Sequence, residues 1–167
     1  SQRMLSEDKS STERFIAIAQ SDASPYIRAT ALHRLGHSGN EDGVNVVVSA
    51  TSDTAWIVRK QAIISLKYFY SKKAEQQLRK LAKDEDPKNQ ILAIESLYLS
   101  QKDDQLSTVL QFLKSDDPTI RNLAAQTFSF VSENRFLTAL KGALEDETEP
   151  RVIMELEKAI TFIEQSR

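Results

Sequence analysis

The chain has no cysteine, only four glycines and four prolines among 167 residues, and no long apolar run. The lack of cysteine excludes disulfides, thiolate catalysis and cysteine-based zinc sites, and it leaves the cellular compartment open. No segment is apolar enough for a transmembrane helix or a signal-peptide core, so we expect no membrane insertion. The chain also lacks a phosphate loop and a glycine-flanked nucleophile. We therefore expect neither an enzyme nor a cofactor.

What the chain does contain is an internal repeat. Its five copies, aligned on a small or apolar anchor, are separated by steps of 31, 31, 31 and 32 residues. Four copies have an apolar residue four positions before the anchor, and all five have one four positions after it, which places these residues on one helix face. Proline stands six positions before the anchor in four copies, where a helix can begin. The anchors are Ala31, Ala62, Ala93, Ala124 and Leu156.

A second set of apolar columns precedes each of these helices and predicts a first amphipathic helix in every copy. Repeats of a helix, a turn and a helix bury their apolar faces against their neighbours and form a solenoid. A β-branched run at Val46, Val47 and Val48 falls on the first-helix register, so we assign it to a helix. We expect helices near 12–21, 24–36, 41–51, 55–70, 73–83, 87–99, 103–114, 118–131, 134–145 and 149–165, after a disordered segment at 1–10.

Proline, a turn Asp or Ser, Ile or Val, Arg, then Ala and Leu at this spacing resemble the HEAT repeat, particularly its short bacterial HEAT-like form, over about 12–165. The resemblance implies an all-α, right-handed α-solenoid, a single domain over 11–167 with repeats near 11–38, 39–71, 72–101, 102–132 and 133–167. It also implies a hydrogen-bonded ladder between repeats, built from a turn Asp and an Arg six residues later. The ladder residues are Asp22, Arg28, Asp53, Arg59 and Arg121. Because later repeats lack one partner, we expect the ladder to weaken toward the C-terminus.

The two halves of the chain carry opposite charge. Residues 1–83 have 13 Lys and Arg against 8 Asp and Glu, a net +5, whereas residues 84–167 have 9 against 16, a net −7. This asymmetry allows head-to-tail self-association. Acidic residues also gather in the turns within repeats, where carboxylates cap the helix that follows.

The only histidines, His33 and His37, are one helical turn apart. No third histidine and no Glu after His33 completes a metal site, and we expect Gly36 to fray the helix before His37, so we predict no metal. Members of the resembled family that hold di-iron use repeated His-Glu pairs, which this chain lacks. DNA-base glycosylases and bilin lyases share such repeats, but a fold alone does not transfer their activities.

We therefore predict a non-catalytic scaffold that presents its second helices, the concave face, to another protein or a peptide. The alternatives are an accessory subunit of a lyase or another small-ligand protein, and a nucleic-acid binder acting through the basic N-terminal half, which the overall acidity disfavours. The face is predicted from positions two before, two after and five after each anchor, together with the helix end at Tyr68 and Phe69. The predicted contact residues are Lys60, Ile64, Lys67, Tyr68, Ile91, Glu95, Tyr98, Asn122, Gln126 and Ser129.

Overall fold

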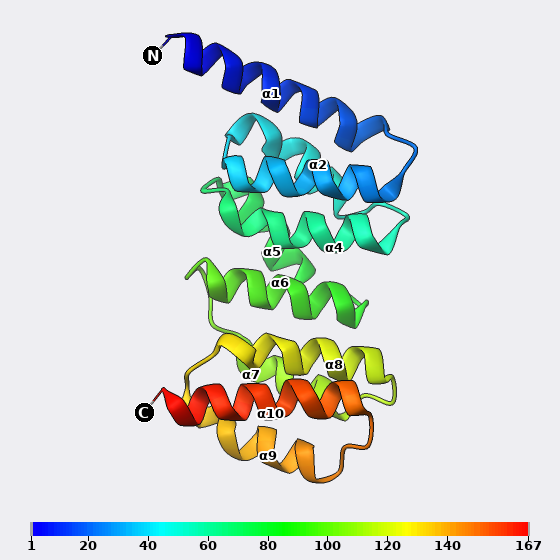
Figure 1. The fold of residues 1–167 in the computed structure, drawn as a ribbon, viewed down its shortest axis with the longest axis vertical. Coiled ribbons are helices and arrows are strands. Elements are labelled where there is room, and N and C mark those ends of the chain that lie inside the picture. Colours follow the sequence, from blue (N-terminus) through cyan, green and yellow to red (C-terminus); the bar gives the residue numbers. More distant parts are fainter. Residues whose placement is uncertain (1, 167) are drawn as a thin grey trace.

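The computed structural model describes the backbone of residues 2–166 and the side chains of residues 10–166 (Figure 1). These residues form helices and no strand, which confirms the all-α fold. None of the helices in this part of the chain combines the length and apolar character needed to cross a membrane. The α-helices are α1 (Gln2–Ser21), α2 (Pro25–Ser38), α3 (Val44–Ala50), α4 (Trp56–Ser65), α5 (Lys72–Leu81), α6 (Pro87–Leu99), α7 (Leu106–Val109), α8 (Pro118–Thr127), α9 (Leu137–Glu145) and α10 (Pro150–Gln165). The 3-10 helices are η1 (Glu41–Gly43), η2 (Leu66–Tyr68), η3 (Leu110–Lys114), η4 (Phe128–Phe130) and η5 (Asn134–Phe136).

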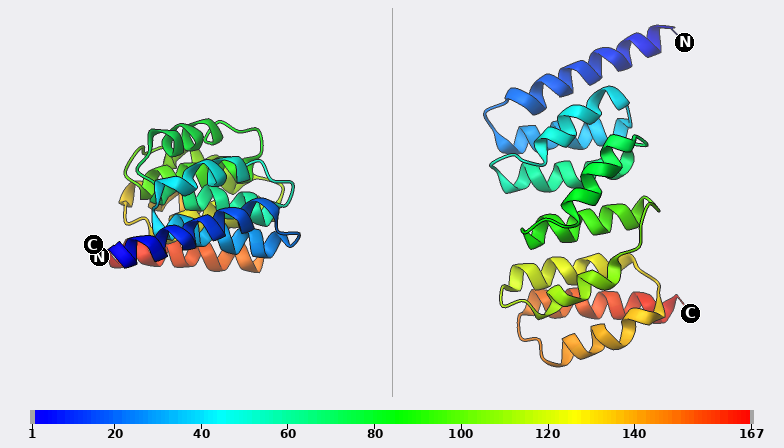
Figure 2. Two further views of the ribbon diagram at one scale, coloured as in Figure 1. Left: turned by 90° about the horizontal axis from the view of Figure 1, so that it is seen from above. Right: turned by 180° about the vertical axis from the view of Figure 1, so that it is seen from behind.

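The helices stack in pairs into a solenoid. The second helices of the repeats, α2, α4, α6, α8 and α10, lie side by side in one layer, while α1 and α9 lie at the two ends of the stack (Figure 1). The view from behind brings α3, α5 and α7 forward, so the first helices of the middle repeats cover the other side (Figure 2). The Val46 to Val48 run lies within α3, as the period predicts. The five-repeat solenoid predicted from the sequence is therefore confirmed.

A recurring turn starts every second helix. The Asp22 carboxylate accepts a hydrogen bond from the Ser24 amide at 2.8 Å, and Asp53 accepts one from Ala55 in the same way. Asp84, Ser115 and Glu147 bind the amide two positions later in the other three repeats. The acidic character of these turns thus has a structural cause, because each side chain fixes the turn from which the next helix begins.

The apolar columns form one continuous core. All five anchors are at most 2% exposed, and Leu78, in the middle of the first-helix column, is fully buried. Ile27 is the exception at 48% exposure, because α2 is the first second helix and no preceding second helix covers this flank. Asn89 occupies the equivalent buried position in α6, and its Oδ1 atom has no hydrogen-bond donor among the described residues.

Gly36 does not fray α2, contrary to the sequence-based expectation. The helix continues through Gly36 and ends before Gly39, which adopts the left-handed conformation with φ 61°. A Cβ atom on Gly36 would lie 2.7 Å from the Cβ atom of Ser65, so the glycine permits close packing of α2 against α4. The Ser65 hydroxyl donates to the Leu32 carbonyl at 3.1 Å across the same contact.

Two segments differ from the expected helix pattern. The backbone is helical from Gln2 onward, where we expected a disordered segment over 1–10; this stretch contains no proline or glycine to interrupt the helix. The first helix of repeat four, expected over 103–114, is shorter, since α7 has four residues and continues as the 3-10 helix η3. The turn before it contains Gln101 with φ 57°, a left-handed conformation that ends α6 and delays the start of α7.

Candidate functional site

The layer of second helices carries a shallow groove of about 340 Å³. Residues from α4, α6, α8, η4 and α10 line it, so it crosses repeats two to five. We call this feature the second-helix groove. Its lining residues are Lys60, Ile64, Leu92, Glu95, Leu123, Gln126, Ser129, Phe130, Glu155 and Lys158.

Apolar side chains form the floor of the second-helix groove. Leu92 and Leu123 are buried, at 2% and 9% exposure, and Ile64 packs against the core while part of its side chain faces the groove. Phe130 is 38% exposed beside them. The floor therefore offers apolar contact area, which a partner's side chains can cover.

Glu95 of α6 introduces a carboxylate into this largely apolar floor. Its Oε2 atom accepts a hydrogen bond from the Thr127 hydroxyl of α8 at 3.1 Å. Burial raises the pKa of the Glu95 carboxyl, and the Thr127 hydrogen bond and the charges of Lys67 and Lys60 only partly oppose this shift. Keeping Glu95 ionised therefore costs the fold free energy.

Glu155 of α10 is a second carboxylate in the groove, at 8% exposure. The Ser129 hydroxyl donates to its Oε2 atom at 3.1 Å, and the Lys158 ammonium lies 3.6 Å from the same oxygen. Ser129 of η4 comes two residues after Thr127, the last residue of α8. The Thr127 hydroxyl orients the carboxylate of α6, and the Ser129 hydroxyl orients the carboxylate of α10. The two acidic side chains are thus held by the solenoid before any partner arrives.

Lys60, Ile64, Glu95, Gln126 and Ser129 were predicted to lie on the interaction face, and all five line the groove. The sequence-based reasoning missed Leu92, Leu123, Phe130, Glu155 and Lys158. Lys158 lies two positions after the anchor Leu156, so the same register extended to repeat five would have found it.

Ile91 is fully buried, so its predicted place on the exposed face is wrong. Its register position, two before the anchor, lies at the seam between neighbouring second helices. Asn122 at the same position shows this, because its amide donates to the Arg151 carbonyl of the next helix at 3.2 Å. A long polar side chain such as Lys60 reaches out of the seam, whereas an apolar one stays inside. Phe69 is also fully buried and does not extend the face.

The remaining predicted residues lie at the edge where the second helices end. Lys67 and Tyr68 line a depression with Leu99 and Lys102. The Tyr98 hydroxyl donates to Glu133 at 3.0 Å and faces an adjoining depression. The ten predicted residues thus separate into five in the groove, three at the edge, and Asn122 and Ile91 at the seams.

Arg28 and Arg59 connect their own turns to the turns of the following repeats. Arg28 donates to the Asp22 carbonyl of its own turn and makes two bonds, of 3.1 and 3.0 Å, to the carboxylate of Asp53 in the next repeat. Arg59 likewise binds the Asp53 carbonyl, but its nearest carboxylate contact, to Asp86, is 3.9 Å. Each arginine therefore fixes its own turn and reaches forward to the following one.

The sequence led us to expect a ladder that weakens toward the C-terminus. In the structure it is weakest in the middle of the solenoid. Gln90 replaces the arginine of repeat three and binds the Ala82 carbonyl within its own repeat. Arg121 of repeat four makes two bonds, of 2.7 and 3.0 Å, to Glu147. The extra residue of repeat five brings Glu147 instead of Asp146 to the pairing position. The Arg121 guanidinium lowers the pKa of the Glu147 carboxyl to about 2.

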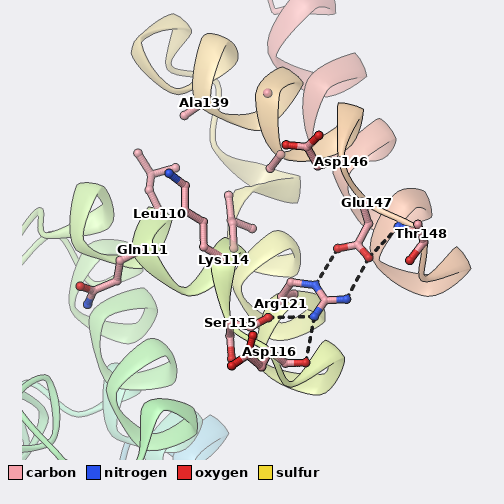
Figure 3. A pocket seen from close by; sticks show the side chains of 13 residues that line it. Leu110, Gln111, Lys114, Ser115, Asp116, Arg121, Ala139, Asp146, Glu147 and Thr148 are labelled. Carbon is pink, nitrogen blue, oxygen red and sulfur yellow. Dashed lines mark hydrogen bonds and ion pairs between the residues drawn. The ribbon is translucent and has the colours of Figure 1, made fainter.

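A larger hollow of about 860 Å³ lies between η3 and α9, among the first helices of repeats four and five (Figure 3). Gly142 of α9 is one of its lining residues, and a Cβ atom there would have no neighbour within 4 Å. Figure 3 shows Arg121 bonded to Ser115, Asp116 and Glu147 at its base. The bonds to Ser115 and Asp116 go to main-chain carbonyls, whereas the bonds to Glu147 go to its carboxylate, so the guanidinium of Arg121 is fully engaged.

The two histidine rings meet edge to face, and His37 also contacts an aromatic ring at a tilt. The His33 and His37 ring centroids are 4.3 Å apart, and His37 lies 4.5 Å from the ring of Tyr68. Burial, together with the nearby His37 and Arg34, lowers the pKa of His33. No group of three or more histidine, cysteine or acidic side chains able to hold a metal ion occurs within the described residues.

Comparison with protein-family models identifies HEAT repeats in two overlapping segments, residues 12–88 and 75–161. Comparison with curated proteins finds no match. The two segments span nearly the whole solenoid and agree with the stacked helix pairs seen in Figure 1. The chain therefore belongs to the HEAT-repeat family.

Proposed function

We propose that this chain is a non-catalytic scaffold that binds a protein or peptide partner in the second-helix groove. HEAT repeats are commonly protein-interaction scaffolds. The observation that carries the proposal is the groove itself, whose lining residues come from four successive repeats. Apolar floor residues and two oriented carboxylates face the same space there.

The size of the groove suits a peptide. Helices pack about 8–10 Å apart, so a groove that crosses four second helices is roughly 27 Å long. An extended chain advances about 3.3 Å per residue, and about eight residues would therefore span it. An amphipathic helix of similar length would also fit.

The composition of the groove favours a protein partner over nucleic acid. Its charged lining is two carboxylates, Glu95 and Glu155, and two lysines, Lys60 and Lys158, so it lacks the excess of positive charge that binds phosphate groups. The net charge of the whole chain is −2, which gives no general attraction for nucleic acid.

Site-specific photo-crosslinking tests the proposal. A benzophenone amino acid at Gln126, in the groove, should crosslink a partner in extracts of the source cells, and the purified partner should then bind the unmodified chain. The same amino acid at Gln76, an exposed position on the first helix α5, is the matched control. Equal crosslinking of the partner from Gln76 and Gln126, or crosslinking from Gln76 alone, would contradict the proposed face.

A further inference from the structure

We propose that the second-helix groove recognises a basic side chain of its partner, an arginine or a lysine, through the carboxylates of Glu95 and Glu155. This inference rests on the proposed function, because it takes the groove to be the partner-binding face. It adds the chemistry of the segment that the groove selects.

The geometry prepares both carboxylates for an incoming donor. The hydroxyls of Thr127 in α8 and Ser129 in η4 hold them by hydrogen bonds of 3.1 Å each. Each bond uses one oxygen, Oε2, of its carboxylate. A carboxylate accepts several hydrogen bonds, so capacity remains for N–H donors from a guanidinium or an ammonium group.

Glu95 is not needed by the fold. The equivalent positions in the neighbouring repeats hold Ile64 and Gln126, which shows that the solenoid tolerates a neutral side chain there. Thr127 is the only hydrogen-bond donor that the described residues provide to Glu95. A desolvated carboxylate with one donor destabilises the fold, and its raised pKa reflects that cost. A charge kept at such a cost is typical of a binding site.

The distribution of charge defines the partner further. Glu155 is buried and Glu95 is half-buried, as is Lys60, whereas the Lys158 side chain is 62% exposed at the rim of the groove. A complementary segment therefore has a basic residue at its centre, apolar residues to cover Ile64 and Phe130, and acidic residues at its ends. Buried charge contacts at the centre of an interface contribute more to affinity than contacts at the rim.

Selection from a phage-displayed library of random dodecapeptides on the immobilised chain tests this inference and does not require the partner to be identified first. The selected peptides are synthesised, and their affinities are measured by fluorescence anisotropy for the wild type and for Glu95→Gln, Glu155→Gln and Glu157→Gln. Glu157 is exposed on α10 and does not line the groove, so its variant controls for the loss of one negative charge. Melting curves confirm that each variant is folded.

We expect the selected peptides to share an arginine or a lysine flanked by apolar residues. Glu95→Gln should weaken their binding at least tenfold, and Glu157→Gln should change it less than twofold. Glu155→Gln should also weaken binding, because both carboxylates contact the basic residue. Replacing the basic residue of the peptide by methionine should weaken wild-type binding at least as much as either variant does, and the same replacement should have a smaller effect in Glu95→Gln, since part of the contact is already lost there.

Two other results would overturn the inference and can be told apart. Some selected peptides could bind the groove, as shown by weaker binding to Gln126→Trp, and yet lack a basic residue or bind Glu95→Gln as tightly as the wild type. Such peptides would refute the inference and leave the proposed function standing. If the selection yields no peptide whose binding depends on the groove, both the inference and the proposed function fail.

Discussion

The ion pair between Arg121 and Glu147 should make the contact between repeats four and five sensitive to acid. The structure shows a two-bond contact in which the Glu147 side chain is 5% exposed and that of Arg121 is 18% exposed. Substituting Glu147→Gln keeps the size and an acceptor oxygen but removes the charge. The substitution therefore isolates the electrostatic part of this contact.

The magnitude follows from the pKa of Glu147. A decrease from 4.5 to about 2 corresponds to at most about 3 kcal/mol, at 1.36 kcal/mol per pKa unit. Solvent at the edge of the solenoid screens the pair, so we expect about 1–2 kcal/mol at pH 7. A carboxylate with a lowered pKa stabilises the folded state above the pKa of the unfolded chain. This contribution is lost as the pH falls from 4.5 toward 2.

Urea unfolding at a series of pH values from 7 to 2.5 measures this effect. The free energy of unfolding of Glu147→Gln should lie below that of the wild type at pH 7, and most of this difference should be lost by pH 2.5. Glu157→Gln, which removes an exposed charge from α10, should differ little from the wild type at any pH. A Glu147→Gln deficit that is absent at pH 7, or that is the same at every pH, would refute the reasoning.

Four further substitutions test the packing and the groove. Glu95→Gln should raise the melting temperature at pH 7 but not at pH 4, because a raised pKa means that stability is lost as the carboxyl ionises with rising pH; an unchanged or lower value at pH 7 would contradict this. Gly36→Ala should lower the free energy of unfolding in urea by about 1–3 kcal/mol, because the added methyl group clashes with Ser65. Gly142→Ala, which places a methyl group in open space, should instead raise it by about 0.5–1 kcal/mol. Similar effects of the two substitutions would argue against the close contact at Gly36. Asn89→Val should raise the free energy of unfolding by about 1 kcal/mol, since it removes a buried acceptor without a donor and gives up only the long 3.4 Å bond from the Asn89 amide to Asp84. A loss of stability would show that the bond to Asp84 outweighs the unpaired oxygen.

The fold could be predicted from the sequence because the apolar positions around the anchor recur in five repeats, and each repeat must bury them in the same way. Ala93 at 0% exposure and Leu156 at 1% are buried for the same reason, although the second lies beyond an insertion. The repeat period also predicts a helix correctly for the valine run in α3, although valine favours strands locally. Periodicity did not reveal the shortening of α7, because that depends on the left-handed turn at Gln101.

The groove could be predicted only in part. Counting from the anchors correctly places Glu95 and Gln126 on the face that carries the groove, but the count treats each helix as if it were isolated from its neighbours. Burial of Ile91 depends on how closely the neighbouring second helices approach it. The hydroxyls that orient Glu95 and Glu155 come from α8 and η4. Their contacts depend on how far each second helix is shifted along its axis relative to its neighbour, and this shift cannot be predicted from a single sequence.

The most direct test of the central claim is the affinity of the crosslinked partner for two tryptophan variants, measured by isothermal titration calorimetry. Gln126→Trp places an indole in the second-helix groove, and Gln76→Trp places one on the exposed surface of α5. The account predicts that Gln126→Trp weakens binding at least tenfold while its melting temperature stays near that of the wild type, and that Gln76→Trp leaves the affinity unchanged. Unaltered affinity in a folded Gln126→Trp variant would contradict the claim that the second helices form the binding face.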